Sequence, residues 1–322
     1  MSKMTRRTFA KLAGASVLLG AGASRSLAAP ADEGGTSRRR FTKELVCGAI
    51  GVRADQRRAI ALARRFGFES VAPSPHELAG LSDGQLEELR GELKETHLMW
   101  GAAGLPVDFR RDERRFRSGM QRLPHLAASL RRAGVVRVGT WLRPTHDTLT
   151  YRANFELHVR RLCEVAEVLA DHGLRFGLEY VGPKTSWAAS RYPFVHTLAE
   201  ARELIAEIGR NNVGLVLDSW HWYTAHETAD DLASLTNADV VACHLNDAPA
   251  GIPVDEQRDN ERELPAATGV IDLKAFLGAL VAIGYDGPVR AEPFNKKLNA
   301  MADEAAVAAT AAAMNKAFAL VS

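Results

Sequence analysis

Short apolar runs alternate with longer amphipathic segments from about residue 45 to the end of the chain. The short runs have the length of buried strands, and the longer segments carry apolar residues at helical spacing. Eight strands are predicted, at Leu45–Ile50, Phe68–Ala72, Leu98–Ala102, Val135–Thr140, Leu174–Tyr180, Val213–Leu217, Val240–Leu245 and Pro288–Glu292. Eight helices are predicted between and after them, at Asp55–Phe66, Ser82–Thr96, Asp112–Ala133, Phe155–His172, Leu198–Ile208, Thr228–Leu235, Leu273–Ile283 and Glu304–Leu320.

This alternation predicts an α/β protein, and eight repeats over this length predict a (β/α)8 TIM barrel. Several helices end at a glycine just before the next strand, as at Gly134 and Gly173, which is a common helix stop. The alternative is an open doubly wound sheet, which would have a Gly-x-Gly-x-x-Gly turn after its first strand. The segment 48–54 lacks that spacing. We therefore expect a single barrel domain over residues 43–322.

Residues 1–30 are predicted to be a twin-arginine-type signal peptide, followed by a flexible leader at 31–42. Arg6 and Arg7 precede a weakly hydrophobic run, and small residues lie before Pro30, as in an export signal. The apolar run is too short and too rich in glycine for a membrane span. We expect export by the twin-arginine route, a periplasmic location, and no stable membrane anchor after cleavage of the signal.

Charge and cysteine content narrow the function classes. The net charge of +2 includes five basic residues and no acid at positions 1–29, so the chain without them carries −3. An acidic protein has no electrostatic reason to bind nucleic acid. Arginine pairs such as Arg110-Arg111 and Arg114-Arg115 alternate with acids, which is typical of a solvated helix face. Three scattered cysteines predict free thiols and not a disulfide framework.

Four consecutive predicted strands, the fifth to the eighth, end in side chains that can bind a metal: Glu179, Asp218, His244 and Glu292. The carboxyl ends of barrel strands meet on one face, where the chemistry of such folds is located. Asp218 follows a fully apolar run, so its charge needs a partner. That partner is either a metal ion or the start of the next helix, which Asp218 would cap.

The residues two positions before these strand ends should form the layer beneath the site. They are Gly177, Val216, Ala242 and Arg290, and the first three suit a barrel interior. Arg290 leaves two alternatives. Either it pairs with an acid inside the barrel, or the predicted orientation of the last strand is off by one residue.

Glu179, Asp218 with His221, His244 and Glu292 resemble the pattern of the xylose-isomerase-like TIM barrels, in their sugar isomerase/epimerase branch. The stretch 264–288 is similar to the segment before that branch's last strand. The resemblance covers roughly residues 45–295. It implies that Glu179, Asp218, His244 and Glu292 bind one divalent ion, with manganese favoured and magnesium or cobalt as alternatives. It also implies that His221 contacts a substrate oxygen.

The resemblance implies a metal-dependent isomerase or epimerase of a sugar or keto-sugar, and the expected export argues against a phosphorylated intracellular substrate. Glu179 and Glu292 would be catalytic: one removes a proton next to a carbonyl and the other returns it, through an enediolate stabilised by the metal. The alternative is a lyase or hydratase on 3-keto-glycosides, which would expel a leaving group instead. A third hypothesis is a non-catalytic carbohydrate-binding barrel. An oligomer is compatible with all three.

Several further residues are candidates for contact with the substrate. In keto-sugar epimerases of this family an arginine follows the histidine ligand by six residues, but Ala250 stands there. Arg258 or Arg262, in the long loop that follows, is expected to replace it. Lys184 lies close enough to Glu179 in sequence to bind substrate, and Trp220 would form part of a hydrophobic wall. His76 and Trp100 or Trp141 could line a sugar pocket by stacking.

Overall fold

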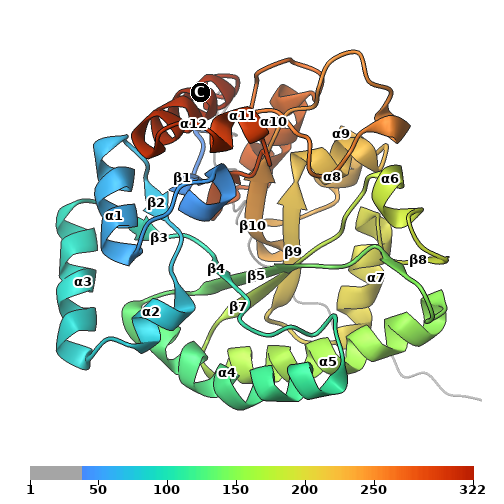
Figure 1. Ribbon diagram of the computed structural model, residues 1–322, viewed down its shortest axis with the longest axis horizontal. Coiled ribbons are helices and arrows are strands. Elements are labelled where there is room, and N and C mark those ends of the chain that lie inside the picture. Colours follow the sequence, from blue (N-terminus) through green and yellow to red (C-terminus); the bar gives the residue numbers. More distant parts are fainter. Residues whose placement is uncertain (1–37) are drawn as a thin grey trace, which may run out of the picture. The chain divides into compact units, whose positions relative to one another are not determined.

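The computed structural model describes residues 38–322 (Figure 1), so the predicted signal peptide and most of the leader lie outside the described residues. Parallel strands form a nine-stranded sheet in the order β3-β2-β1-β11-β10-β9-β7-β5-β4. Their bounds are β1 Thr42–Leu45, β2 Ser70–Val71, β3 Met99–Trp100, β4 Ala103–Gly104, β5 Arg137–Trp141, β7 Arg175–Glu179, β9 Val213–Asp218, β10 Val240–Leu245 and β11 Pro288–Ala291. Two further strands, β6 Thr145–His146 and β8 Tyr192–Pro193, form a separate antiparallel pair.

The two edge strands of the sheet, β3 and β4, are the halves of one barrel strand. β3 pairs with β2 and β4 pairs with β5, and only Gly101 and Ala102 lie between them. The break is occupied by Glu44, whose Oε1 accepts a hydrogen bond from Ala102 N at 2.9 Å. A Cβ at position 101 would lie 1.7 Å from that oxygen, so a larger residue there would displace the Glu44 carboxylate. The sheet therefore closes as a (β/α)8 barrel, as predicted from the sequence.

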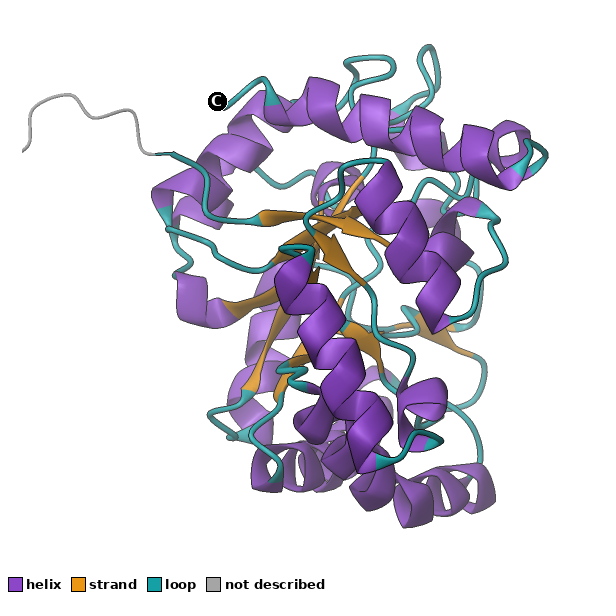
Figure 2. Ribbon diagram, turned by 90° about the vertical axis from the view of Figure 1, so that its left-hand side faces the viewer, coloured by secondary structure: helices purple, strands orange, loops and turns teal. Residues whose placement is uncertain are grey.

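Helices cover the outside of the sheet (Figures 1 and 2). Several begin at a side-chain cap, such as Ser82 before α3 and Thr197 before α7, and satisfy their first N–H groups in this way. The helices are α1 Gln56–Arg65, α2 Pro75–Ala79, α3 Asp83–Glu95, α4 Glu113–Ala133, α5 Tyr151–Asp171, α6 Lys184–Trp187, α7 Leu198–Ile208, α8 Ser219–Thr224, α9 Ala229–Ala233, α10 Leu273–Ala282, α11 Lys296–Asn299 and α12 Asp303–Phe318. Between residues 38 and 322, no helix is both long and apolar enough to cross a membrane.

The first strand differs from its prediction. β1 covers Thr42–Leu45, whereas Cys47–Ile50 forms a short 3-10 helix that ends at Gly51. This strand was not predicted because Thr42 and Glu44 carry polar side chains, so residues 42–45 do not form an apolar run. Just before the strand, Phe41 is buried and Arg39 pairs with Glu69 at 2.7 Å. Residues 39–41, at the end of the predicted leader, thus pack against the barrel.

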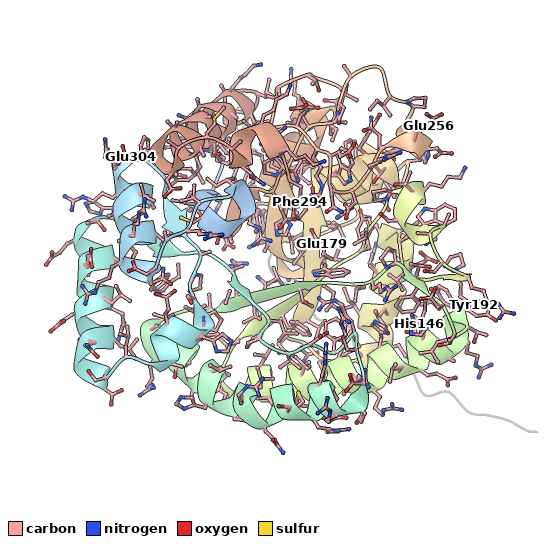
Figure 3. The ribbon with its side chains drawn as sticks, viewed as in Figure 1. His146, Glu179, Tyr192, Glu256, Phe294 and Glu304 are labelled. Atoms are coloured by element: carbon pink, nitrogen blue, oxygen red, sulfur yellow. The ribbon has the colours of Figure 1, made fainter. Side chains whose placement is uncertain are left out.

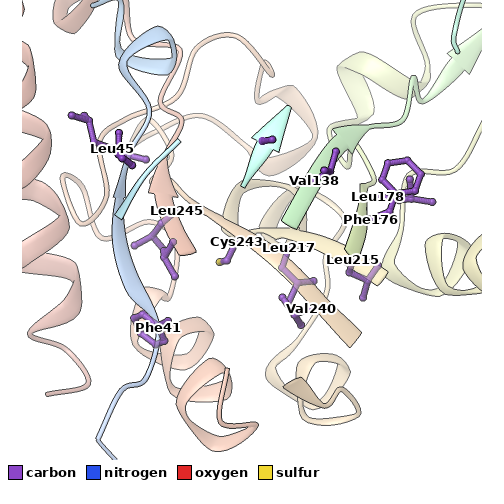
Figure 4. Packing of buried hydrophobic residues seen from close by; sticks show 14 of the residues in the cluster. Phe41, Leu45, Val138, Phe176, Leu178, Leu215, Leu217, Val240, Cys243 and Leu245 are labelled. Atoms are coloured by element: carbon purple, nitrogen blue, oxygen red, sulfur yellow. The ribbon is translucent and has the colours of Figure 1, made fainter. Parts of the chain in front are cut away.

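The main hydrophobic core lies between the sheet and the helices. Figure 4 shows part of it, with Phe176, Leu215 and Leu245 pointing away from the barrel axis. A second, much smaller cluster inside the barrel contains Ala102, Val216 and Ala242. The last two belong to the layer that the sequence places beneath the site. The three cysteines are free, as predicted.

Candidate metal centre and active site

The four predicted ligands meet at the carboxyl ends of neighbouring strands. Glu179 ends β7, Asp218 ends β9, His244 lies near the end of β10, and Glu292 follows β11. One ligand atom from each residue can be chosen so that all four atoms lie within 4.8 Å of one another. Their convergence follows from the register, because His244 pairs directly with Asp218 across the β9–β10 ladder.

The donor atoms fit a cation. Glu179 Oε1 and His244 Nδ1 are 2.7 Å apart, yet both are buried and neither makes a hydrogen bond of acceptable geometry. Buried polar atoms without partners are rare, and two such atoms sharing one space are typical of ligands of one ion. Three carboxylates and one imidazole suit hard or borderline divalent ions.

Two buried arginines partly balance the carboxylates. Arg262 Nη1 lies 2.7 Å from Asp218 Oδ2 and 3.7 Å from Glu292 Oε2, and Arg290 Nη2 lies 2.8 Å from Glu292 Oε1. Burial raises the pKa of Glu292, but His244, Arg290 and Arg262 outweigh it and hold the pKa well below its usual range. Arg290 therefore pairs with an acid at the centre of the barrel, which was the first of its two alternatives.

Asp218 has both of the roles that the sequence left open. Its Oδ1 accepts hydrogen bonds from Trp220 N at 2.8 Å and from Asn246 Nδ2 at 3.0 Å, so it caps α8. Its Oδ2 remains directed at Arg262 and the ligand cluster. Helix capping fixes the carboxylate in place, and only one of its oxygens is used to do so.

Of the two arginines expected to replace the family's loop arginine, Arg262 reaches the site and Arg258 does not. Arg258 is exposed. Arg262 is only 2% exposed, and its guanidinium lies over the rings of Trp220 and Phe294, at 5.4 and 4.8 Å from their centroids. Asp259 Oδ1 holds Arg262 Nη2 at 2.7 Å. This loop therefore folds back over the ligands.

Of the other predicted substrate contacts, His221 reaches the site, whereas Lys184 and Trp220 do not. His221 faces the site, with Nε2 at 3.8 Å from Asp218 Oδ2, and its Nδ1 accepts a hydrogen bond from Gly182 N, which places the proton on Nε2. Lys184 instead pairs with Asp255 at 2.8 Å on the surface. Trp220 is fully buried behind Arg262. Neither Lys184 nor Trp220 lines the cavity described next.

A cavity of about 560 Å³ opens above the ligands, within the range of about 300–1,000 Å³ that small-molecule sites occupy. Of the three candidates for stacking, its lining includes Trp141 but neither His76 nor Trp100, and it adds Arg110 and Phe294, which the sequence did not suggest. Figure 3 shows Glu179 and Phe294 near the centre of the barrel face, with Glu256 at its periphery. Arg110 lies on a loop far from any strand end, so no strand-end pattern could indicate it, whereas Phe294 follows the ligand Glu292 by two residues but carries no polar group.

Behind His221, the buried Tyr180 and the partly buried Glu227 support the wall of the site. The Tyr180 ring lies 6.3 Å from the His221 ring, and its hydroxyl donates a hydrogen bond to Glu227 Oε2. Glu227 Oε1 accepts a further bond from Leu198 N at 2.6 Å. Burial raises the pKa of Glu227 to about 7, although both hydrogen bonds oppose this shift.

The chain belongs to the xylose isomerase-like TIM barrel family, whose family model matches residues 60–317. Among curated proteins, an inosose isomerase of Bacillus velezensis is 27% identical over 216 residues, which is 66% of this chain and 74% of that protein. A 3-dehydroshikimate dehydratase of Pseudomonas aeruginosa is 33% identical over 135 residues, which is 42% of this chain and 20% of that protein.

Solved structures show the same fold. A xylose isomerase domain protein from Alicyclobacillus acidocaldarius superposes with a TM-score of 0.74 at 32% identity, over 84% of this chain and 96% of that one. The IOLI protein, solved with a bound zinc atom, superposes with a TM-score of 0.70 at 22% identity, over 86% of this chain and 97% of that one. The second likeness, at this identity, establishes only the fold.

Replacing Arg262 tests the charge balance of the cluster. Arg262→Ala removes the buried arginine partner of Asp218 and leaves Glu292 with Arg290 alone, so we expect the metal-free protein to lose about 3–5 kcal/mol of unfolding free energy in urea. Saturating Mn²⁺ should restore part of this loss by supplying positive charge. Arg258→Ala is the matched control and should stay within about 0.5 kcal/mol of wild type. Equal effects of the two substitutions would contradict the assignment.

Glu227 predicts a pH dependence of stability. The folded protein holds a proton on Glu227 up to pH about 7, whereas an unfolded glutamate releases it near pH 4.3, so this contribution to stability is present at low pH and lost as pH rises through about 7. In the wild type, this group should lower the free energy of unfolding by roughly 2–3 kcal/mol between about pH 4.3 and pH 7. Glu227→Gln should abolish that decrease, as measured by urea unfolding. Glu95→Gln, at an exposed position, is the control and should not change how the free energy of unfolding depends on pH. If Glu227→Gln showed the same pH dependence as the wild type, the prediction would be wrong.

Proposed function

We propose that the protein is a divalent-metal-dependent isomerase or epimerase of a sugar or keto-sugar, which removes and returns a proton next to a carbonyl. The observation that carries this proposal is the pair Glu179 and Glu292 beside Asp218 and His244, at the base of a cavity large enough for a sugar. The inosose isomerases among the relatives support the same class.

The residues that would hold the ion are Glu179, Asp218, His244 and Glu292. We propose manganese, with magnesium or cobalt as alternatives; the zinc in the IOLI structure keeps zinc among the metals to test. When bound, the ion would polarise the substrate carbonyl and offset the negative charge that develops as the proton leaves.

The two glutamates differ in their surroundings, and this difference suggests their roles. Among the described residues, Glu179 has no arginine or lysine within 4.0 Å, and its Oε1 lacks a hydrogen bond. Glu179 is therefore the freer carboxylate and would remove the proton. Glu292, between Arg290 and Arg262, has a depressed pKa, so it would carry a proton only when one is passed to it, for example from Glu179 through a hydroxyl of the substrate. Delivery of that proton by Glu292 to the opposite face of the same carbon would give epimerisation. Delivery by Glu179 to the former carbonyl carbon on the same face, with a proton moving between the two oxygens, would give isomerisation.

Two residues beside the glutamates would orient the substrate. His221 lines the cavity, with its Nε2 3.4 Å from Arg262 Nη2. With Nδ1 accepting from Gly182 N, a neutral His221 would carry its proton on Nε2 and would donate it in a hydrogen bond to a substrate oxygen. Arg262 also lines the cavity and, besides balancing charge, would place a donor next to an oxygen of the sugar. Both side chains are almost completely buried, so they are preorganised for this contact.

A second candidate is a lyase or dehydratase acting on 3-keto-glycosides or related compounds. The similarity to a 3-dehydroshikimate dehydratase favours it. The same base would remove the same kind of proton, but a β-hydroxyl or an alkoxide would leave instead of the proton being returned. We further propose that the chain is exported to the periplasm, on the basis of the signal pattern in residues 1–30.

Hydrogen exchange separates these reactions. The Mn²⁺-loaded protein is incubated in D₂O with free keto-sugars and with 3-keto-glycosides, and the products are followed by NMR. Deuterium next to the carbonyl in an intact skeleton is the expected result, whereas loss of the aglycone or of water would indicate the second candidate. Absence of exchange with every compound would contradict both, and would leave a binding protein.

The same assay tests the role of Glu179. Glu179→Gln keeps one oxygen donor for the metal but cannot take a proton, so we expect a loss of exchange of about 10²–10⁴-fold. Glu256→Gln, at an exposed position in the loop after β10, is the matched control and should behave as wild type. Metal content is measured for each variant, because a loss of metal alone would also abolish exchange.

A further inference from the structure

Arg110 stands apart from the other arginines that line the cavity. Arg262 and Arg290 each pair with a carboxylate of the ligand cluster. Arg110 also lines the cavity, but within residues 38–322 no carboxylate lies within 4.0 Å of its guanidinium. A half-buried cation without an anionic partner is costly in a protein, and a bound ligand is one source of that partner.

The guanidinium of Arg110 is held rigidly in place. It lies over the rings of Phe109 and Trp141, at 4.4 and 4.2 Å from their centroids. Nε and Nη2 donate hydrogen bonds to Trp141 O at 2.9 and 2.6 Å, and Nη2 also donates to Thr140 Oγ1 at 2.5 Å. Among the described residues, Nη1 donates no hydrogen bond. Burial lowers the pKa of Arg110 to about 10, which still leaves it charged at neutral pH.

A second hollow continues the cavity on the far side of Arg110. It also has a volume of about 560 Å³ and shares Leu105 and Arg110 with the first. Its other wall is the first part of α4, with Arg114, Arg115 and Arg122. Four arginines thus line this groove, which we call the arginine groove.

The arginine groove has a large excess of positive charge. Asp108 is the one carboxylate in its lining, and it lies 3.7 Å from Arg111, outside the lining. Arg115 lies 3.6 Å from Asp112, and Arg122 donates to Ser118 Oγ at 2.9 Å. Arg114 has no ion pair in the part of the chain that the structure describes. An anion entering here would gain charge–charge attraction that a neutral sugar would not.

We propose that the substrate carries an oxyanion, a carboxylate or a phosphate, on the end remote from the metal site, and that Arg110 binds it where the cavity meets the arginine groove. The inference deepens the proposed function by naming the substrate class as an acidic sugar. The fixed fork of a guanidinium matches two oxygens of such a group, and its immobilisation between two rings reduces the entropy lost on binding.

Binding measurements test the proposal without turnover. Calorimetry on the Mn²⁺-loaded protein compares D-glucose, D-glucuronate and D-glucose 6-phosphate. At least one anion should bind about 10- to 100-fold more tightly than glucose, which is the range for hydrogen bonds to a charged group. A preference for glucuronate assigns a carboxylate, and a preference for glucose 6-phosphate assigns a phosphate.

Arg110→Gln should abolish this preference, whereas Arg111→Gln should retain it. Arg111 is adjacent, exposed and lines neither the cavity nor the groove, so it controls for the loss of one positive charge. Equal affinity for all three ligands in the wild type would overturn the proposal. So would an anion preference that persists in Arg110→Gln, because the anion would then be bound by the metal or elsewhere.

A second variant is needed because Arg110 also supports the end of β5. Arg114→Gln/Arg122→Gln changes two exposed side chains of α4 and should fold normally. It should weaken anion binding about 2- to 10-fold at low salt, with less effect at high salt, because it removes longer-range attraction. If Arg110→Gln does not fold, an unchanged anion preference in this double variant would overturn the proposal.

The two proposals can fail separately. Anion preference that disappears in Arg110→Gln would support this inference even if no compound exchanged a proton in D₂O. Conversely, neutral keto-sugars could exchange protons equally well in wild type and Arg110→Gln, while the protein binds anionic sugars no more tightly than neutral ones. In that case the proposed function would stand and this inference would be wrong.

Discussion

The structure depends on the burial of three carboxylates at one place. Glu179, Asp218 and Glu292 contribute oxygens that lie within 4.8 Å of one another and of His244. Like charges at such distances, removed from water, would destabilise the fold by several kcal/mol unless positive charge accompanied them. Arg262 and Arg290 supply two positive charges. Burial and Arg290 oppose protonation of His244, but Glu179 and Glu292 outweigh them and raise its pKa to about 9, so without a metal the imidazolium supplies the third charge. A divalent cation would displace that proton and take over its role, which is the physical reason to expect one.

The barrel positions these groups in a way that few other arrangements would allow. Parallel strands in register bring four side chains from distant parts of the chain to one face, while Gly177, Val216 and Ala242 form the layer beneath them. A Cβ at Gly177 would lie 2.7 Å from Val216 Cγ2, so this layer is already filled. Above the ligands, the loop after β10 carries Arg262 back over the site.

Residues on strands were predictable from the sequence, and residues on loops were not. The four ligands could be found because a strand end fixes where a side chain points, and the apolar run before Asp218 made its charge conspicuous. The first strand was predicted at the wrong residues because the polar side chains of Thr42 and Glu44 interrupt its apolar pattern. Sequence could not choose between Arg258 and Arg262, since the choice depends on how the loop folds.

The same distinction explains why Arg110 was not recognised from the sequence. As one of several arginines near acids, it matched a solvated helix face, and that remains a good description of Arg114 and Arg115 as exposed side chains. Its contacts with Trp141 and Thr140 join segments that are thirty residues apart. Only the folded chain shows that these segments place a fixed cation at the mouth of the cavity.

The most direct test of the central claim is the position of the metal itself. Crystals grown with Mn²⁺ are measured at the manganese absorption edge, and an anomalous difference map locates the ion. The account predicts one strong peak about 2.0–2.6 Å from an oxygen of Glu179, Asp218 and Glu292 and from a ring nitrogen of His244. A peak elsewhere, or one in contact with fewer than three of these side chains, would contradict it.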